Sequence, residues 1–174
     1  VDQQVLRSTA GEETDLTAVR YGATVAARAV TITYSLLPDR YRVNVAATVS
    51  GAAENTYLLV DLPPAFRSSE ADTAEDHNHL AYAYKRDAEG ATGVAFSSLD
   101  PGEREIAAGP IMWAVAKSKY FLVGMLAPVG KPGFAELNVT GGERRGKQAT
   151  RAQATAVIPL IGGSTAFEMY AGPQ

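Results

Sequence analysis

GPIMWAVAKSKYFLVGMLAP, residues 109–128, predicts the centre of the fold. It contains two apolar runs, residues 111–116 and 120–128, separated by the polar residues 117–119. Each run has the length of a strand buried on both faces, and neither approaches the roughly 20 apolar residues that a membrane-spanning helix needs. We therefore expect the central strand pair of a β-sheet core, with the single tryptophan, Trp113, packed inside it.

The segment before this stretch predicts a β-hairpin. Residues 30–36 and 41–49 alternate apolar and polar side chains, and the Leu-Pro-Asp-Arg sequence between them favours a turn. The pattern is typical of an antiparallel pair with one face in water. Residues 1–14 offer few apolar side chains, so we expect a short edge strand there, followed by a mobile acidic loop at residues 11–13.

Several other segments read as strands. Residues 56–62 form a continuous apolar run that ends at two prolines, which predicts another central strand. Residues 68–78 are acidic and predict a loop. Shorter strands are expected at residues 80–84, 94–96, 105–108, 134–140, 152–160 and 166–170. With no sustained helical periodicity and no internal repeat, the chain predicts an all-β sandwich of mostly antiparallel strands with little helix, forming one domain over residues 1–174.

Composition excludes several classes of protein. The chain is 46% hydrophobic and 20% charged, as in ordinary globular proteins, and its net charge of −3 argues against a nucleic-acid binder. The one basic cluster, residues 143–147, is expected to be a solvated loop. The absence of cysteine excludes disulfides, thiolate metal sites and cysteine nucleophiles. Neither an initiator methionine nor a signal peptide nor a spanning run is present, so we expect a mature domain or a piece of a larger protein.

The two histidines are the first candidates for chemistry. His77 and His79 stand two residues apart, with Glu75 nearby. On a strand this spacing would place both imidazoles on one face, where they could bind a metal ion or polarise a sugar oxygen. They lie in the most acidic part of the chain, however, so the interpretation we favour is a pair of solvated loop histidines.

Other reactive residue types give weaker signals. Ser164 follows two glycines but lacks the Gly-x-Ser-x-Gly pattern of a nucleophile elbow, so we expect a turn. The carboxylate pairs fall in exposed connections, where we expect no general-acid chemistry: Glu103 with Glu105, and Asp72 with Glu75.

Three aromatic residues, Trp113, Tyr120 and Phe121, could line a ligand cleft, although aromatic residues in central strands usually belong to the core. The sequence therefore predicts no catalytic, cofactor-binding or metal site, and it does not identify the residues that bind a partner.

Two segments carry a resemblance to a known family. Trp113 is followed seven and eight residues later by Tyr120 and Phe121, and then by an apolar strand that ends at Pro128. This segment resembles the periplasmic domain of YidC-type membrane protein insertases. The ending FEMYAGPQ, residues 167–174, is similar to the aromatic-x-leucine-tyrosine-x-Gly-Pro-Lys tail of that domain, with glutamine in place of lysine. We extend the match from about residue 30 to the last residue.

The resemblance implies a β-supersandwich, the fold shared with galactose-mutarotase-like proteins. It implies a non-enzymatic domain on the periplasmic side of the bacterial inner membrane, as part of a multi-pass protein that inserts and folds membrane proteins without a cofactor. Its expected partners are the Sec translocon, the SecDF accessory complex and nascent membrane proteins. An exposed sheet edge or a concave sheet face would supply the contact. Residues 1–29 are shorter than the corresponding part of the large enterobacterial domain.

Two other functions remain open from the sequence. Fold analogy allows a mutarotase-like carbohydrate-binding module or epimerase, which would need histidines and carboxylates brought together in an aromatic-lined cleft. A secreted β-sandwich that serves as an adhesion or scaffold module is the third possibility.

Overall fold

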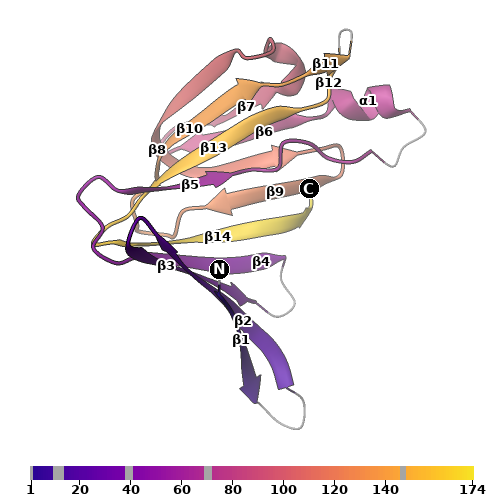
Figure 1. The fold of residues 1–174 in the computed structure, drawn as a ribbon. Coiled ribbons are helices and arrows are strands. Elements are labelled where there is room, and N and C mark those ends of the chain that lie inside the picture. The colour runs from indigo at the N-terminus through magenta and orange to yellow at the C-terminus, as the bar shows by residue number, and fades with distance from the viewer. Residues whose placement is uncertain (1, 10–13, 38–40, 69–71, 146–147) are drawn as a thin grey trace.

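A computed structural model describes residues 2–9, 14–37, 41–68, 72–145 and 148–174. Figure 1 shows that most of them belong to one strongly curled antiparallel sheet. The order along this 12-stranded sheet is β1-β2-β3-β4-β14-β9-β8-β10-β13-β5, and β6 joins β8 and β7. The strands are β1 (Asp2–Thr9), β2 (Thr14–Val25), β3 (Arg28–Leu36), β4 (Arg42–Val49), β5 (Tyr57–Asp61), β6 (Ala81–Arg86), β7 (Ala91–Ala95), β8 (Arg104–Lys117), β9 (Phe121–Leu126), β10 (Phe134–Gly141), β13 (Ala152–Pro159) and β14 (Ser164–Pro173).

The remaining elements are small. β11 (Arg144–Arg145) and β12 (Gln148–Ala149) form a separate two-stranded sheet. The helices are α1 (Thr73–Asn78) and a short 3-10 helix (Phe96–Ser98). The sequence predicted a loop where α1 forms. Its first turn is held by the Asp72 side chain, which accepts hydrogen bonds from the backbone N–H groups of Ala74 and Glu75.

Strand β8 lies at the centre of the sheet, as its apolar sequence predicts. One part of β8 pairs with β10, and its last residues pair with β6 on one side and β9 on the other. The pairing changes near Gly109, which precedes a cis proline bond, and a Cβ atom at this position would collide with the carbonyl oxygens of Phe134 and Ala135. Glycine therefore permits the close approach of β10. The separate strand predicted at residues 105–108 is wrong, because that segment continues without a break into β8.

The curled sheet folds over onto itself, and its inner face forms the core. The aromatic ring of Phe134 on β10 meets that of Phe167 on β14 edge-on, with 6.4 Å between their centroids. Tyr82 on β6 is fully buried against Phe96, and its hydroxyl lies 2.8 Å from the carbonyl oxygen of Ala152 on β13. Burial raises the pKa of the Tyr82 phenol above its ordinary value, chiefly because the charged form would lose its hydration.

Trp113 is not in the core, contrary to the sequence prediction. Ala114 and Ala116 of β8 are fully buried, whereas Trp113 is half-buried on the other face, between Leu126 and Lys85 of the neighbouring strands. Alternation along a strand places successive side chains on opposite faces, so only one of the two sets can point inward. Here the small alanines take the crowded inner face, and the prediction that this strand is buried on both faces is wrong.

β5 is an edge strand, although its apolar sequence predicted a central one. It pairs with β13 alone, and within the described residues no strand covers its other side. Tyr57 is 46% exposed and Leu59 is 65% exposed. A short apolar run therefore did not distinguish a buried strand from an apolar edge, because both favour the same residue types.

Of the remaining sequence predictions, some are confirmed and one is wrong. The hairpin of β3 and β4 is confirmed, and so is β1 as an edge strand; residues 11–13 lie outside the described residues. Arg144 of the basic cluster is held rather than solvated: its guanidinium donates to the carbonyl oxygens of Ser97 and Leu99 and pairs with Asp100. No helix in the described part of the chain is long and apolar enough to cross a membrane.

Candidate functional site

The inner face of the sheet continues beyond the core as an apolar trough. In one row across neighbouring strands, Tyr21 of β2 lies beside Ile32 of β3, Ile32 beside Ala47 of β4, and Ala47 beside Thr165 of β14. A second row consists of Val19, Tyr34, Val45 and Phe167. Because directly opposed residues of antiparallel strands share a face, each row is a continuous stripe. We call these two rows the apolar trough. Its part on β4 and β14 is buried at Val45, Ala47 and Phe167, and its part on β2 and β3 is open.

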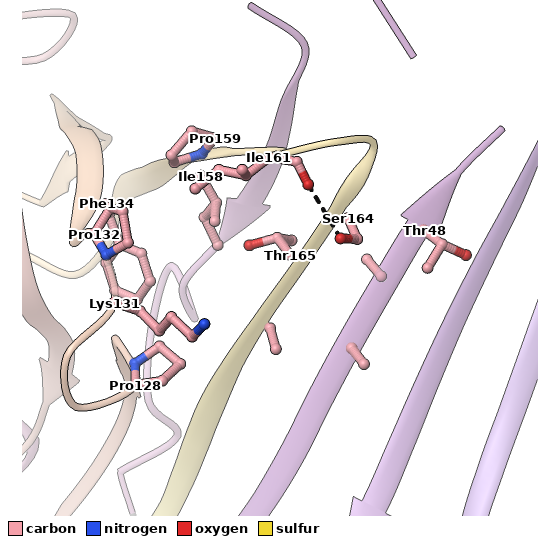
Figure 2. Close-up of a pocket in the computed structure, with 13 residues that line it drawn as sticks. Thr48, Pro128, Lys131, Pro132, Phe134, Ile158, Pro159, Ile161, Ser164 and Thr165 are labelled. Carbon is pink, nitrogen blue, oxygen red and sulfur yellow. Dashed lines mark hydrogen bonds between the residues drawn. The ribbon is translucent and has the colours of Figure 1, made fainter. Parts of the chain in front are cut away.

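At one end the trough deepens into a cleft of about 540 Å³ between β14 and β4 on one side and β13 with the β9–β10 loop on the other. Figure 2 shows these residues, with Phe134, Ile158 and Pro132 facing the strand that carries Thr165. The full lining is Ala46, Ala47, Thr48, Pro128, Lys131, Pro132, Phe134, Ile158, Pro159, Ile161, Ser164, Thr165 and Ala166. Small side chains on β4 and β14 leave the space that larger residues fill deeper in the core.

Polar groups are sparse in the cleft. Lys131 is the single ionisable side chain among its described lining residues. Ser164 donates its hydroxyl to the carbonyl oxygen of Ile161 at 3.1 Å and thereby closes the turn between β13 and β14. This confirms the turn predicted there, in which Gly162 and Gly163 adopt positive φ values. The cleft suits an apolar ligand whose orientation few hydrogen bonds would fix.

At its other end the trough is open. Val19, Tyr21, Ile32 and Tyr34 line a shallow depression of about 450 Å³ on β2 and β3. The rings of Tyr21 and Tyr34 pack edge-on with centroids 5.9 Å apart, and all four side chains remain half-exposed. They are left open because the layer that covers the core ends at β5. Figure 1 shows β2 extending with β1 away from the rest of the sheet.

Exposed apolar side chains lie near the mouth of the cleft. Ile161, itself a lining residue, is 62% exposed, and Val129, which follows the lining residue Pro128, is fully exposed. Tyr57 of the edge strand β5 is the direct partner of the lining residue Pro159. Exposed apolar surface that adjoins a cleft is typical of a site that contacts another molecule.

The predicted chemical candidates do not converge on this site. His77 and His79 stand at the end of α1, and Glu75 of the same helix pairs with Lys119 at 3.7 Å. No three histidine or carboxylate side chains come together in a metal-binding arrangement within the described ranges. The carboxylate of Glu103 accepts a hydrogen bond from the Asp100 backbone N–H at 2.7 Å and so stabilises a turn.

The sequence reasoning missed the trough itself. The alternation of residues 30–36 and 41–49 showed that one face is apolar, but it did not show how much of that face the rest of the chain covers. The expectation that Trp113, Tyr120 and Phe121 belong to the core is wrong, since Trp113 is half-buried and the other two are exposed. None of the three lines the cleft, which was the alternative. The available signal was the run of small residues on β4 and β14, since alanine and threonine opposite larger side chains leave space between two layers.

Comparison with known proteins agrees with this fold. A galactose mutarotase-like protein from Lactobacillus casei ATCC 334 is similar in structure, with a TM-score of 0.53 and 14% sequence identity, over 98% of this chain and 73% of that chain. At this identity the likeness shows the fold alone, and it confirms the mutarotase-like sandwich. A search of curated proteins gives no match.

The family comparison is decisive. The model of the YidC periplasmic domain matches residues 3–174, so the likeness begins well before residue 30, where the sequence motifs placed it. The chain therefore belongs to the YidC periplasmic domain family.

Proposed function

We propose that this domain is a non-catalytic docking module of a YidC-type insertase, and that the apolar trough holds an apolar segment of a partner protein. The family supports a place on the periplasmic side of a membrane protein that takes part in membrane protein insertion. The partners we propose are a component of the Sec translocon, its SecDF accessory complex, or a membrane protein segment during insertion.

One observation carries the proposal: the inner face stays apolar across four adjacent strands, from β2 to β14, while the covering layer leaves its outer part open. The open part of the trough, on β2 and β3, and the cleft beside Thr165 together offer apolar surface for one extended segment. Burying apolar area contributes about 25 cal/mol per Å², so a partner with one apolar face would gain from occupying the trough.

The chemistry of the cleft favours docking over catalysis. A general acid or base needs an ionisable group within hydrogen-bond reach of the reacting atom. The described cleft lining has Lys131 alone in this category, and its other polar side chains are the hydroxyls of Thr48, Ser164 and Thr165. Such a surface can bind apolar side chains, and we assign it no reaction.

Photocrosslinking in the membrane-embedded insertase tests the proposal. A benzophenone amino acid at Thr165, inside the cleft, is expected to give adducts with a Sec component or with a nascent membrane protein. The matched control is Thr92, which is exposed on β7 outside the trough. If both positions give the same adducts, or if Thr165 gives none, the trough is not the docking site.

The mutarotase-like fold keeps one alternative: a carbohydrate-binding module or an epimerase. It predicts that simple aldoses release heat on titration into the domain and that exchanging His77 and His79 for alanine abolishes this heat. Absence of heat at millimolar sugar would remove the alternative and leave the docking proposal unaffected.

A further inference from the structure

A second apolar surface lies at the end of the strands opposite the cleft. It consists of Tyr41, Tyr120, Phe121 and Tyr170, which we call the aromatic end. Phe121 lies opposite Pro173 and Tyr170 opposite Gly124, so these two side chains project from opposite faces of the sheet and the surface runs across the strand ends. Tyr41 is 62% exposed, Tyr120 47% and Phe121 56%. These residues come from three neighbouring strand ends, since β14 pairs with β4 on one side and with β9 on the other.

Hydrogen bonds join these three strand ends. The backbone N–H of Ala171 donates to the carbonyl oxygen of Tyr41 at 2.9 Å, and that of Gln174 donates to the carbonyl oxygen of Tyr120 at 2.9 Å. The Gln174 side-chain amide also donates to the carbonyl oxygen of Ser118 at 2.7 Å. The backbone under the aromatic rings is therefore fixed, and their exposure does not come from an unpaired segment.

Two of the rings also pack against each other. Tyr41 and Tyr170 meet edge-on at 6.1 Å between centroids, directly over Gly172. A Cβ atom at Gly172 would lie 2.8 Å from both the Tyr41 ring and the Tyr170 hydroxyl oxygen. Glycine thus leaves room for both rings, whose planes cross at 64°, and the Tyr170 hydroxyl donates to the carbonyl oxygen of Pro173 at 2.9 Å.

A cation stands next to this surface. The Lys119 ammonium lies 5.3 Å from the centroid of the Tyr120 ring and 3.7 Å from the carboxylate of Glu75. Arg42 at the start of β4 pairs with Glu168 of β14 at 3.3 Å. Ammonium and guanidinium groups beside amphipathic rings are the combination that favours the boundary between lipid headgroups and hydrocarbon.

We propose that the aromatic end contacts the lipid headgroup surface of the membrane. This inference goes beyond the docking function of the trough, because it concerns a different surface and a different class of partner. The family supports a position beside a bilayer, and the rings supply apolar area with phenol hydroxyls that can reach water or headgroups. Arg42 and Thr48 lie six residues apart on β4, so the cleft stands about 20 Å from the lipid contact and stays open.

Fluorescence on vesicles tests this placement. A single reporter tryptophan is introduced as Phe121→Trp at the aromatic end or as Val129→Trp at the cleft end, each in a Trp113→Phe background. Both variants are mixed with phosphatidylethanolamine vesicles that contain phosphatidylglycerol and a spin-labelled lipid. We expect a blue shift and quenching for Phe121→Trp and neither for Val129→Trp. Equal quenching at both positions, or none at either, would overturn the proposal.

The charge beside the rings gives an independent readout in the chain with its native Trp113. One lysine near an anionic membrane surface contributes about fivefold to binding, so Lys119→Gln should weaken co-sedimentation with phosphatidylglycerol vesicles by about that factor. Glu75→Gln removes the carboxylate that pairs with Lys119 and should strengthen binding to phosphatidylglycerol vesicles.

Neither change should affect binding to uncharged vesicles. The double variant Tyr120→Ser with Phe121→Ser should abolish binding to charged and uncharged vesicles alike. The control Val129→Ser should bind both kinds as the native chain does. If Tyr120→Ser with Phe121→Ser binds as the native chain does, the aromatic end is not a lipid contact. Crosslinking at Thr165 does not depend on these residues, so the failure of either proposal can be told from the failure of the other.

Discussion

The hydroxyl of Tyr82 on β6 lies 2.8 Å from the carbonyl oxygen of Ala152 on β13, so a buried hydrogen bond joins two strands that are not neighbours in the sheet. The same hydroxyl is 3.0 Å from the carbonyl oxygen of Pro63. Tyr82 therefore ties the chain that follows β5 to the core, and several consequences can be measured.

Tyr82→Phe should lower the free energy of unfolding by about 1–3 kcal/mol, because it removes a buried donor and leaves carbonyl oxygens without it. Urea denaturation followed by circular dichroism measures this change. Tyr57→Phe is the matched control, since Tyr57 is 46% exposed and should unfold as the native chain does. A loss below about 0.5 kcal/mol for Tyr82→Phe would mean that water replaces the hydroxyl without penalty.

The raised pKa of Tyr82 predicts a loss of stability in alkali. The unfolded phenol ionises near pH 10.0, whereas the folded one holds its proton to higher pH because burial disfavours the anion. This contribution is fully present below pH 10 and is lost as the pH rises toward the folded pKa, at up to about 1.4 kcal/mol per pH unit. Above pH 10, Tyr82→Phe should therefore lose stability less steeply than the native chain. Parallel slopes would contradict this assignment.

Gly109→Ala should destabilise the domain by about 1–3 kcal/mol, because the added methyl group would force β8 and β10 apart. Thermal or urea unfolding checks it. Gly90→Ala is the control, since a Cβ atom there would meet nothing within 4 Å. Equal stability of the two variants would show that β10 moves away without cost.

Trp113→Ala should lower the free energy of unfolding less than Met125→Ala does, even though tryptophan is much larger than methionine. Met125 is fully buried, and its truncation is expected to cost about 2–5 kcal/mol. Trp113 is half-buried on the outer face, so truncating it removes only the buried part of its apolar area. Urea unfolding of both variants measures the two losses. A larger loss for Trp113→Ala would mean that Trp113 is buried in the core.

Leu59→Lys should reduce self-association of the domain while changing its unfolding free energy little. Leu59 is 65% exposed on β5, whose outer edge no described strand covers, and a lysine on an apolar edge disfavours strand-to-strand pairing between molecules. Light scattering on concentrated samples measures the effect. Ile106→Lys provides a comparison, since Ile106 is 58% exposed but lies on the interior strand β8.

Much of the architecture followed from the sequence, for definable reasons. The alternation in residues 30–36 and 41–49 identified β3 and β4, because the period of two is specific to strands. The apolar runs around Trp113 correctly marked β8 and β9 as neighbours. Local pattern did not show which face of β8 points inward or that β5 is an edge, because both depend on strands distant in sequence.

The site depended still more on tertiary structure. Ala47 and Thr165 have no chemical signature, and their importance arises only because β4 and β14 become neighbours and the covering layer stops at β5. Conversely, His77 and His79 have a suggestive spacing but stand at the end of a short helix and do not line the cleft. A search for reactive residue types does not detect a surface defined by small and apolar side chains.

The position of β14 between β4 and β9 has a consequence for the order of folding. Tyr170 of β14 pairs with Arg42 on one side and Gly124 on the other. Among the described strands, β14 alone joins the part of the sheet formed by β1 to β4 to the remainder. A chain delivered from its N-terminus can form the early hairpins at once, because their partners are near in sequence. It cannot close the sheet until residues 164–173 have also emerged. Until then the apolar inner faces of two partial sheets are exposed to water. The last strand of the chain is therefore the one that joins them.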